Sequence, residues 1–166
     1  MIPSVFKLAI VFAMATGCGE AAAACIAMPG PGQSIPLTSV VNLALGGSSA
    51  VFTGKVTAIE YVPAPDEGAG DLDAQVVRVA AHSWWKGAES EEVTLHTANH
   101  RNAAGDTSTE AHEYRYEVGK SYLIYAGAFR GALYANVCTR TKAIEDAADD
   151  IAMLDALKAE AEVPSQ

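Results

Sequence analysis

The sequence contains few basic residues, and this scarcity limits the partners that the chain can bind. It has 11 lysines and arginines against 20 aspartates and glutamates, which gives a formal net charge of −9. Loss of residues 1–24 would remove one cation, Lys7, and one anion, Glu20, and would leave that charge unchanged. An acidic chain gains no electrostatic attraction to phosphate backbones, and no nucleic-acid-binding motif occurs in it. We therefore expect no nucleic-acid partner.

Long apolar runs are also absent. The run Leu8–Thr16 is well short of the ~20 apolar residues that a membrane-crossing helix needs. With Lys7 ahead of it and alanines at the −1 and −3 positions before Cys25, the start of the chain is typical of a secretory signal. We predict cleavage after Ala24, a mature protein that begins at Cys25, and a secreted or periplasmic location.

Two other fates of this leader stay open. The letters "ATGC", which end at Cys18, resemble the processing site of a bacterial lipoprotein. Acylation of Cys18 would anchor the protein in the bacterial envelope, and only in that case do we expect a membrane contact. The leader could instead be retained as a buried helix.

The sequence also lacks the short motifs of common catalytic sites. It has no nucleophile elbow, phosphate-binding loop or dinucleotide fingerprint. His96 and His100 are four residues apart, but in a predicted strand this spacing is about 13 Å, and "HTANH" lacks the glutamate of a zinc-protease motif. We therefore expect no catalytic residue, no cofactor and no metal site, and a protein that is not an enzyme. A metal-dependent enzyme that uses the loop between His100 and His112 is the remaining alternative.

Only two cysteines, Cys25 and Cys138, would remain after removal of the leader. In an exported chain two cysteines form a disulfide more often than a metal site. A Cys25–Cys138 bridge would close a loop of more than a hundred residues, for which chain entropy gives at most ~4–5 kcal/mol of stabilisation. Two free thiols are the alternative.

Hydrophobic periodicity predicts a mainly β chain with a helix near each end. The strands are expected at Ala50–Val62, Ala74–Trp85, Glu91–Thr97, Lys120–Phe129 and Gly131–Cys138, and the helices at Leu37–Gly47 and Ala143–Glu162. The polar segment Ala98–Gly119 has no clear period and is expected to be a loop. Five short strands and a terminal amphipathic helix indicate a five-stranded OB-like barrel with that helix packed on it. We expect one domain over residues 25–160 and a tail over residues 161–166.

Individual residues refine this prediction. Gly54, inside the first strand, indicates a bulge or a bend, and Arg130 and Gly131 indicate a hairpin turn. Adjacent strand residues face opposite ways, so one of the two tryptophans should be buried; we expect Trp84 outward and Trp85 inward. The pair Asp149–Asp150 should lie on the solvated side of the last helix.

The last helix should have one apolar stripe. Its members are Ile144, Ala148, Ile151, Leu154 and Leu157.

Four segments in order resemble one family. They are "VFTGKV" (51–56), "WWKG" (84–87), "VGKSYLIYA" (118–126) and "NVCTRT" (136–141). With a cysteine at the predicted start, they resemble bacterial members of the tissue inhibitor of metalloproteinases family, which are netrin-like modules. The family's Cys-x-Cys-x-Pro start is matched by Cys25 and Pro29, whereas Ala27 replaces the second cysteine. A mid-chain cysteine that related bacterial chains often carry is absent too.

The resemblance implies a barrel with helices packed on it and an inhibitory wedge. The amino group and the carbonyl oxygen of Cys25 would chelate the catalytic zinc of a protease, and Ile26 would fill its specificity pocket. A disulfide to Cys138 would hold this wedge rigid and reduce the entropy lost on binding. The wedge requires a free amine on Cys25, so acylation at Cys18 would abolish it.

The expected partner is therefore a zinc metalloprotease or another extracellular or envelope protein. A Cys25 with only a structural role, in a lipid-anchored envelope protein without inhibitory activity, is the alternative.

Overall fold

The computed structural model describes residues 34–64 and 72–162. The predicted leader, the processing sites at Ala24 and Cys18, and the predicted wedge of Cys25 and Ile26 lie outside the described residues. In the part that is described, no helix is both long enough and apolar enough to span a bilayer.

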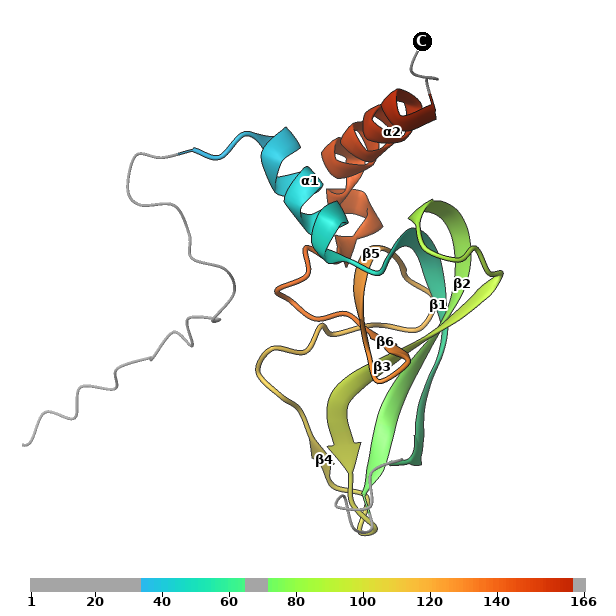
Figure 1. Cartoon of the computed structure of the whole chain (residues 1–166). Coiled ribbons are helices and arrows are strands. Elements are labelled where there is room, and N and C mark those ends of the chain that lie inside the picture. Colours follow the sequence, from blue (N-terminus) through green and yellow to red (C-terminus); the bar gives the residue numbers. More distant parts are fainter. Residues whose placement is uncertain (1–33, 65–71, 163–166) are drawn as a thin grey trace, which may run out of the picture.

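Residues 34–64 and 72–162 form two α-helices, one short 3₁₀ helix and seven strands, most of which Figure 1 labels. In chain order these are α1 (Leu37–Gly47), β1 (Ala50–Pro63), β2 (Asp73–Lys86), β3 (Glu92–Arg101), β4 (Thr107–Ser108), β5 (Ser121–Phe129), β6 (Ala132–Tyr134), β7 (Lys142–Ala143), η1 (Ile144–Asp146) and α2 (Ala148–Glu162). The mainly β class and the helix at the carboxyl end of the described residues are confirmed.

Five of the strands form a sheet that closes on itself. The order is β1-β2-β3-β6-β5, and β5 pairs back onto β1. The contact between β3 and β6 is parallel, whereas the other four contacts of the ring are antiparallel. The short strands β4 and β7 pair with β3 and β5. Closure leaves residues 51–55, at the start of β1, paired on both sides.

The sheet has a core on each face. Phe52, Val77, Leu95 and Ile124 are among the residues that fill the inside of the ring. The opposite face of β1 and β5 packs against α1 and α2, which lie at the same end of the sheet (Figure 1). Because both faces are covered there, "AVFT" in β1 and "YLIYA" in β5 are buried without alternation.

Gly54 lies at a close approach between β1 and β2, and the predicted irregularity is confirmed. The register with β2 shifts between Thr53 and Gly54. A Cβ atom on Gly54 would lie 2.4 Å from Val79 Cγ1 and 2.8 Å from the carbonyl oxygen of Ala80. The second of these contacts is with backbone, which cannot move without disturbing the strand pairing. Only glycine fits this position.

The predicted hairpin turn between β5 and β6 is also confirmed. Arg130 and Gly131 both have positive φ, 50° and 82°. Two such residues between paired strands form the tight turn whose twist matches that of a hairpin. However, β6 ends at Tyr134 and not at Cys138, so the cysteine lies in the turn between β6 and β7.

The prediction of a loop over residues 98–119 is wrong at its start. β3 continues to Arg101, and His100 and Arg101 pair with β4. Residues 98–101 do not alternate between apolar and polar side chains, because at this end of β3 polar side chains fill the inside of the ring. The buried side chains of Thr97 and Asn99 both bond the Gln75 amide oxygen, at 3.2 and 2.9 Å.

The apolar stripe of the last helix also needs a correction. The regular helix begins at Ala148, after η1, and the residue buried next to the sheet is Ala147. Ala148 itself is exposed, whereas Leu154 is fully buried and Ile151 and Leu157 pack beside it. The 3₁₀ turn at 144–146 shifts the helical phase by one position, which the periodicity could not show.

The close approach at Gly54 predicts a large effect from one methyl group. Gly54→Ala should lower the free energy of unfolding by about 1–3 kcal/mol, because the added Cβ overlaps Val79 and Ala80. Denaturant unfolding measures the change. Gly127→Ala in β5 is the matched control, since its Cβ would meet no atom within 4 Å, and it should change stability by less than about 0.5 kcal/mol. Equal effects of the two substitutions would contradict the close approach.

Candidate functional site

The turn that carries Cys138 is held by hydrogen bonds within residues 136–141. The Asn136 side-chain oxygen accepts from the Cys138 amide at 2.9 Å, and the Thr139 hydroxyl donates to the Asn136 carbonyl at 2.9 Å. Asparagine and threonine form such side-chain turns because their short polar groups reach nearby backbone. These bonds fix the backbone on either side of the Cys138 sulfur.

Further hydrogen bonds attach this turn to the rest of the domain. The Tyr125 amide in β5 donates to the Thr141 hydroxyl at 3.1 Å. The Val137 amide donates to the His112 carbonyl at 2.9 Å, which joins the turn to the segment between β4 and β5. The cysteine is therefore carried by a segment with contacts on two sides.

A buried carboxylate, Asp150, connects α2 to the same turn. Its side chain is 2% exposed. The Arg140 guanidinium donates to both carboxylate oxygens at 2.6 and 2.8 Å, and the Lys142 ammonium donates to one of them at 3.1 Å. The Tyr125 hydroxyl donates from β5 at 3.3 Å. We call these four residues the Asp150 cluster.

The prediction that Asp149 and Asp150 are both solvated is wrong for Asp150. Asp149 is exposed, whereas Asp150, in the first turn of α2, faces the turn between β6 and β7. Arg140 adopts a positive φ of 66°, which an arginine adopts only where surrounding contacts hold it. The amino end of the helix also favours a negative charge at this position.

Burial, hydrogen bonds and charges within the cluster shift the pKa values of its members. Burial alone would raise the pKa of Asp150, but the hydrogen bonds from Arg140 and Lys142 outweigh it, so the pKa lies below its ordinary value. Burial and the charge of Asp150 raise the pKa of the Tyr125 hydroxyl. The bond to Asp150 also raises the pKa of Arg140. Asp150 is therefore a carboxylate at neutral pH, and Arg140 is its charged partner.

A second carboxyl, that of the half-buried Glu113, fastens the segment that precedes β5. Glu113 accepts the Ala98 amide of β3 at 3.0 Å through one oxygen, and its other oxygen has no hydrogen-bond partner among the described residues. Burial raises the pKa of this carboxyl, against the effect of the Ala98 hydrogen bond. Glu113 also forms an isolated antiparallel β-bridge with Asn136, so it contacts the start of the Cys138 turn.

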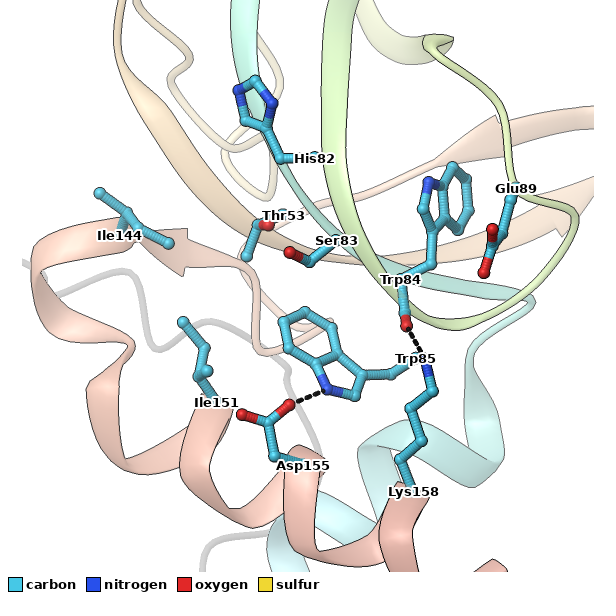
Figure 2. A pocket seen from close by; sticks show the side chains of 10 residues that line it. All are labelled: Thr53, His82, Ser83, Trp84, Trp85, Glu89, Ile144, Ile151, Asp155 and Lys158. Carbon is cyan, nitrogen blue, oxygen red and sulfur yellow. Dashed lines mark hydrogen bonds between the residues drawn. The ribbon is translucent and has the colours of Figure 1, made fainter. Parts of the chain in front are cut away.

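A groove lies between the end of β2 and α2, and Ile144 of η1 also lines it. Its volume is about 500 Å³. Figure 2 shows the residues that line it: Thr53, His82, Ser83, Trp84, Trp85, Glu89, Ile144, Ile151, Asp155 and Lys158. The Trp85 indole donates to the Asp155 carboxylate at 2.7 Å, and the Lys158 ammonium donates to the Trp84 carbonyl at 3.1 Å. The groove was not predicted from the sequence.

The two tryptophans point to opposite sides of β2, as their adjacency requires. Trp85 packs against the core beneath the helices, as expected. Trp84, expected to face outward, instead stacks on Phe52 with the ring centroids 4.6 Å apart, and it packs against the core of the ring. Both faces of β2 are covered at this end, so neither indole is fully exposed.

The remaining predicted residues are not brought together. Within residues 34–64 and 72–162, no group of three or more histidine, cysteine, aspartate or glutamate side chains is placed to hold a metal ion. His100 lies in a smaller hollow with Asn102 and Asp106, while His112 contacts the Cys138 turn through its backbone. Cys138 is the one cysteine of the described ranges, so its pairing with Cys25 stays a prediction.

No model of a known protein family matches the chain, and no curated protein is significantly similar to it.

The Asp150 cluster predicts that removal of one charge destabilises the domain. Asp150→Asn should lower the free energy of unfolding by about 2–3 kcal/mol, because it leaves two largely buried cations without their counter-charge. Chemical denaturation measures the loss. Asp149→Asn, an identical change at an exposed neighbour, should cost less than about 0.5 kcal/mol. Similar losses in the two variants would refute the role of the cluster.

The lowered pKa of Asp150 predicts a defined pH dependence. A carboxyl whose pKa is lower in the folded state stabilises the protein above its unfolded pKa of about 4, and this contribution is lost as pH falls through the folded pKa. The stability difference between wild type and Asp150→Asn should therefore be constant from pH 5 to pH 7 and shrink below about pH 4. Unfolding curves at several pH values test this; a difference that grew on acidification would oppose it.

Proposed function

We propose that this chain is an exported protein-binding module that inhibits a zinc metalloprotease through Cys25, in the manner of the tissue inhibitors of metalloproteinases. The observation that carries the proposal is the convergence of the four segments that resemble this family. They are far apart in the sequence, yet the folded chain brings them to one end of the ring.

The contacts between these segments are direct. Phe52 of the first segment stacks on Trp84 of the second. Phe52 also pairs with Ile124 of the third segment in the β1–β5 ladder, and Tyr125 of the third bonds Thr141 of the fourth. Gly87, which ends the second segment, has a φ of 100° and would place a Cβ 3.2 Å from Ala50. The residues that resemble the family are therefore those that close the ring and position the Cys138 turn.

The sheet order is compatible with an OB-like barrel. A five-stranded OB barrel is a Greek-key ring, and here β1, β2, β3, β6 and β5 form a closed ring with a single parallel contact. The helices cover the outside of β1 and β5. This arrangement supports the family resemblance at the level of architecture.

The proposed mechanism needs an amino terminus held in a fixed place. A disulfide from Cys25 to Cys138 would attach the leading residues to the turn that the Asp150 cluster and Thr141 hold in place. The amine and the carbonyl oxygen of Cys25 would then occupy the open coordination position of the target's zinc, and Ile26 would enter the adjoining pocket. Because the turn is already ordered, little entropy is lost on binding.

A lipid-anchored envelope protein without inhibitory activity is the second candidate. The "ATGC" segment that ends at Cys18 favours it, since acylation there would leave Cys25 inside the chain. The two candidates differ in the first residue of the mature protein.

Intact mass and inhibition assays together test the proposal. We expect a mature mass that begins at Cys25, and inhibition of at least one enzyme in a panel of purified zinc metalloproteases. An alanine added before Cys25 should abolish inhibition, because it converts the chelating amine into an amide. Ile26→Gly should weaken it by about 30-fold or more, the effect of truncating a central anchor residue.

Leu43→Gly, at an exposed apolar position of α1, is the matched control and should inhibit normally if the helix is intact by circular dichroism. A diacylglyceryl mass at Cys18, or full inhibition by the extended protein, would refute the proposed mechanism.

A further inference from the structure

Two buried polar atoms on the segment before β5 have no hydrogen-bond partner among the described residues. They are the second carboxylate oxygen of Glu113, Oε2, and the hydroxyl of Tyr116. Tyr116 is only 8% exposed, and its side chain packs in the core inside the ring of strands. A buried polar atom without a partner costs free energy, and most such atoms in folded proteins bond either the protein or an ordered water. Two of them on one short segment indicate a ligand.

The two atoms act on each other electrostatically. Burial, Tyr114 and then the charge of Glu113 raise the pKa of the Tyr116 hydroxyl, so the carboxylate acts on this hydroxyl within the core. Burial also raises the pKa of Glu113, whose other oxygen accepts the Ala98 amide at 3.0 Å. Together the atoms offer a ligand one O–H donor and one carboxylate acceptor.

The neighbouring hydroxyl groups have other partners. The Thr141 hydroxyl, which lowers the pKa of Tyr116, accepts the Tyr125 amide at 3.1 Å. The Tyr122 hydroxyl, whose ring centroid lies 5.2 Å from that of Tyr116, accepts the Glu117 amide at 3.0 Å. Neither of them forms a hydrogen bond with the Tyr116 hydroxyl.

The chemistry of the site selects a small neutral ligand. A metal ion is a poor match, because the site offers a single carboxylate and a phenol that stays protonated. Water both donates and accepts, and buried waters in proteins bond otherwise unsatisfied polar groups in this way.

We propose that one internal water molecule binds between Glu113 and Tyr116, accepting the Tyr116 hydroxyl and donating to Oε2 of Glu113. The water joins the core of the ring to a residue that also bonds Ala98 of β3 and forms the bridge with Asn136. It therefore stabilises the segment on which the start of the Cys138 turn rests. The site is independent of the proposed wedge.

The stability of Tyr116→Phe is the first test. Removal of a hydroxyl that bonds a water should raise the unfolding equilibrium constant about threefold to tenfold, the effect of one lost hydrogen bond. Removal of an unbonded buried hydroxyl would instead lower this constant. Denaturant unfolding of the full chain measures the change.

NMR of the same variant tests the water and its second partner. Oxygen-17 relaxation dispersion, which detects long-lived internal waters, should show one water fewer in Tyr116→Phe than in the wild type. Carbon-13 titration of the carboxyl groups should show a higher pKa for Glu113 in this variant, because its carboxylate loses a donor. Tyr122→Phe is the matched control. It removes a hydroxyl that already bonds Glu117, so both the water and the pKa of Glu113 should stay as in the wild type.

Three results would each overturn the proposal. They are a Tyr116→Phe variant at least as stable as the wild type, an unchanged number of long-lived waters, or equal pKa values of Glu113 in the two phenylalanine variants. A loss of stability with no loss of water would assign the Tyr116 hydroxyl to a direct bond with the protein. Each measurement can be made on protein that inhibits no protease, so this site and the wedge can fail separately.

Discussion

The ion pairs of Asp150 determine how α2 and the Cys138 turn lie on the sheet. Removing a carboxylate from water costs several kcal/mol, and only close, complete bonding offsets that cost. Here the carboxylate receives two bonds from Arg140 and one each from Lys142 and Tyr125. The residues that supply these bonds come from β5, β7 and the turn before β7. Any other placement of α2 would leave a buried charge unpaired, so the cluster selects one arrangement among those that would bury similar apolar area.

The second core depends on that arrangement. Tyr125 and Leu123 point away from the inside of the ring and are fully buried only because α1 and α2 cover them. Leu154 lies one helical turn from Asp150 and packs on the same face of the sheet. The polar cluster therefore fixes the direction of the helix, and the apolar residues beside it supply the stabilisation. The groove follows from the same placement, because Trp85 belongs to β2 whereas Asp155 and Ile151 belong to α2.

The parts of the fold that were predicted correctly are governed by local chemistry. Gly54 indicated an irregularity because glycine inside a strand allows another backbone to approach, and Arg130–Gly131 indicated a tight turn. Asp150 could not be identified in this way, since its ion-pair partners are eight and ten residues earlier and meet it only after a turn with a positive-φ arginine.

Alternation correctly placed the tryptophans on opposite faces, but it could not show that both faces are covered at the end of β2. The polar end of β3 was not predicted. Its buried residues Thr97 and Asn99 are polar and are satisfied by hydrogen bonds to Gln75, and hydrophobic periodicity cannot detect buried polar residues.

The Cys138 turn and the groove share one rigid support. Residues 136–141 form the turn, Ile144 borders the groove six residues after Cys138, and the Asp150 cluster binds this stretch to the helix that carries Asp155. A wedge attached to Cys138 would therefore keep a fixed orientation relative to the groove beside Trp85. For a partner that contacts both, the second contact would be intramolecular and would form at a high effective concentration. A weak contact in the groove would thus add specificity to a wedge whose zinc-chelating atoms are the same for every zinc protease, because only a partner whose surface also fits the groove would gain from it.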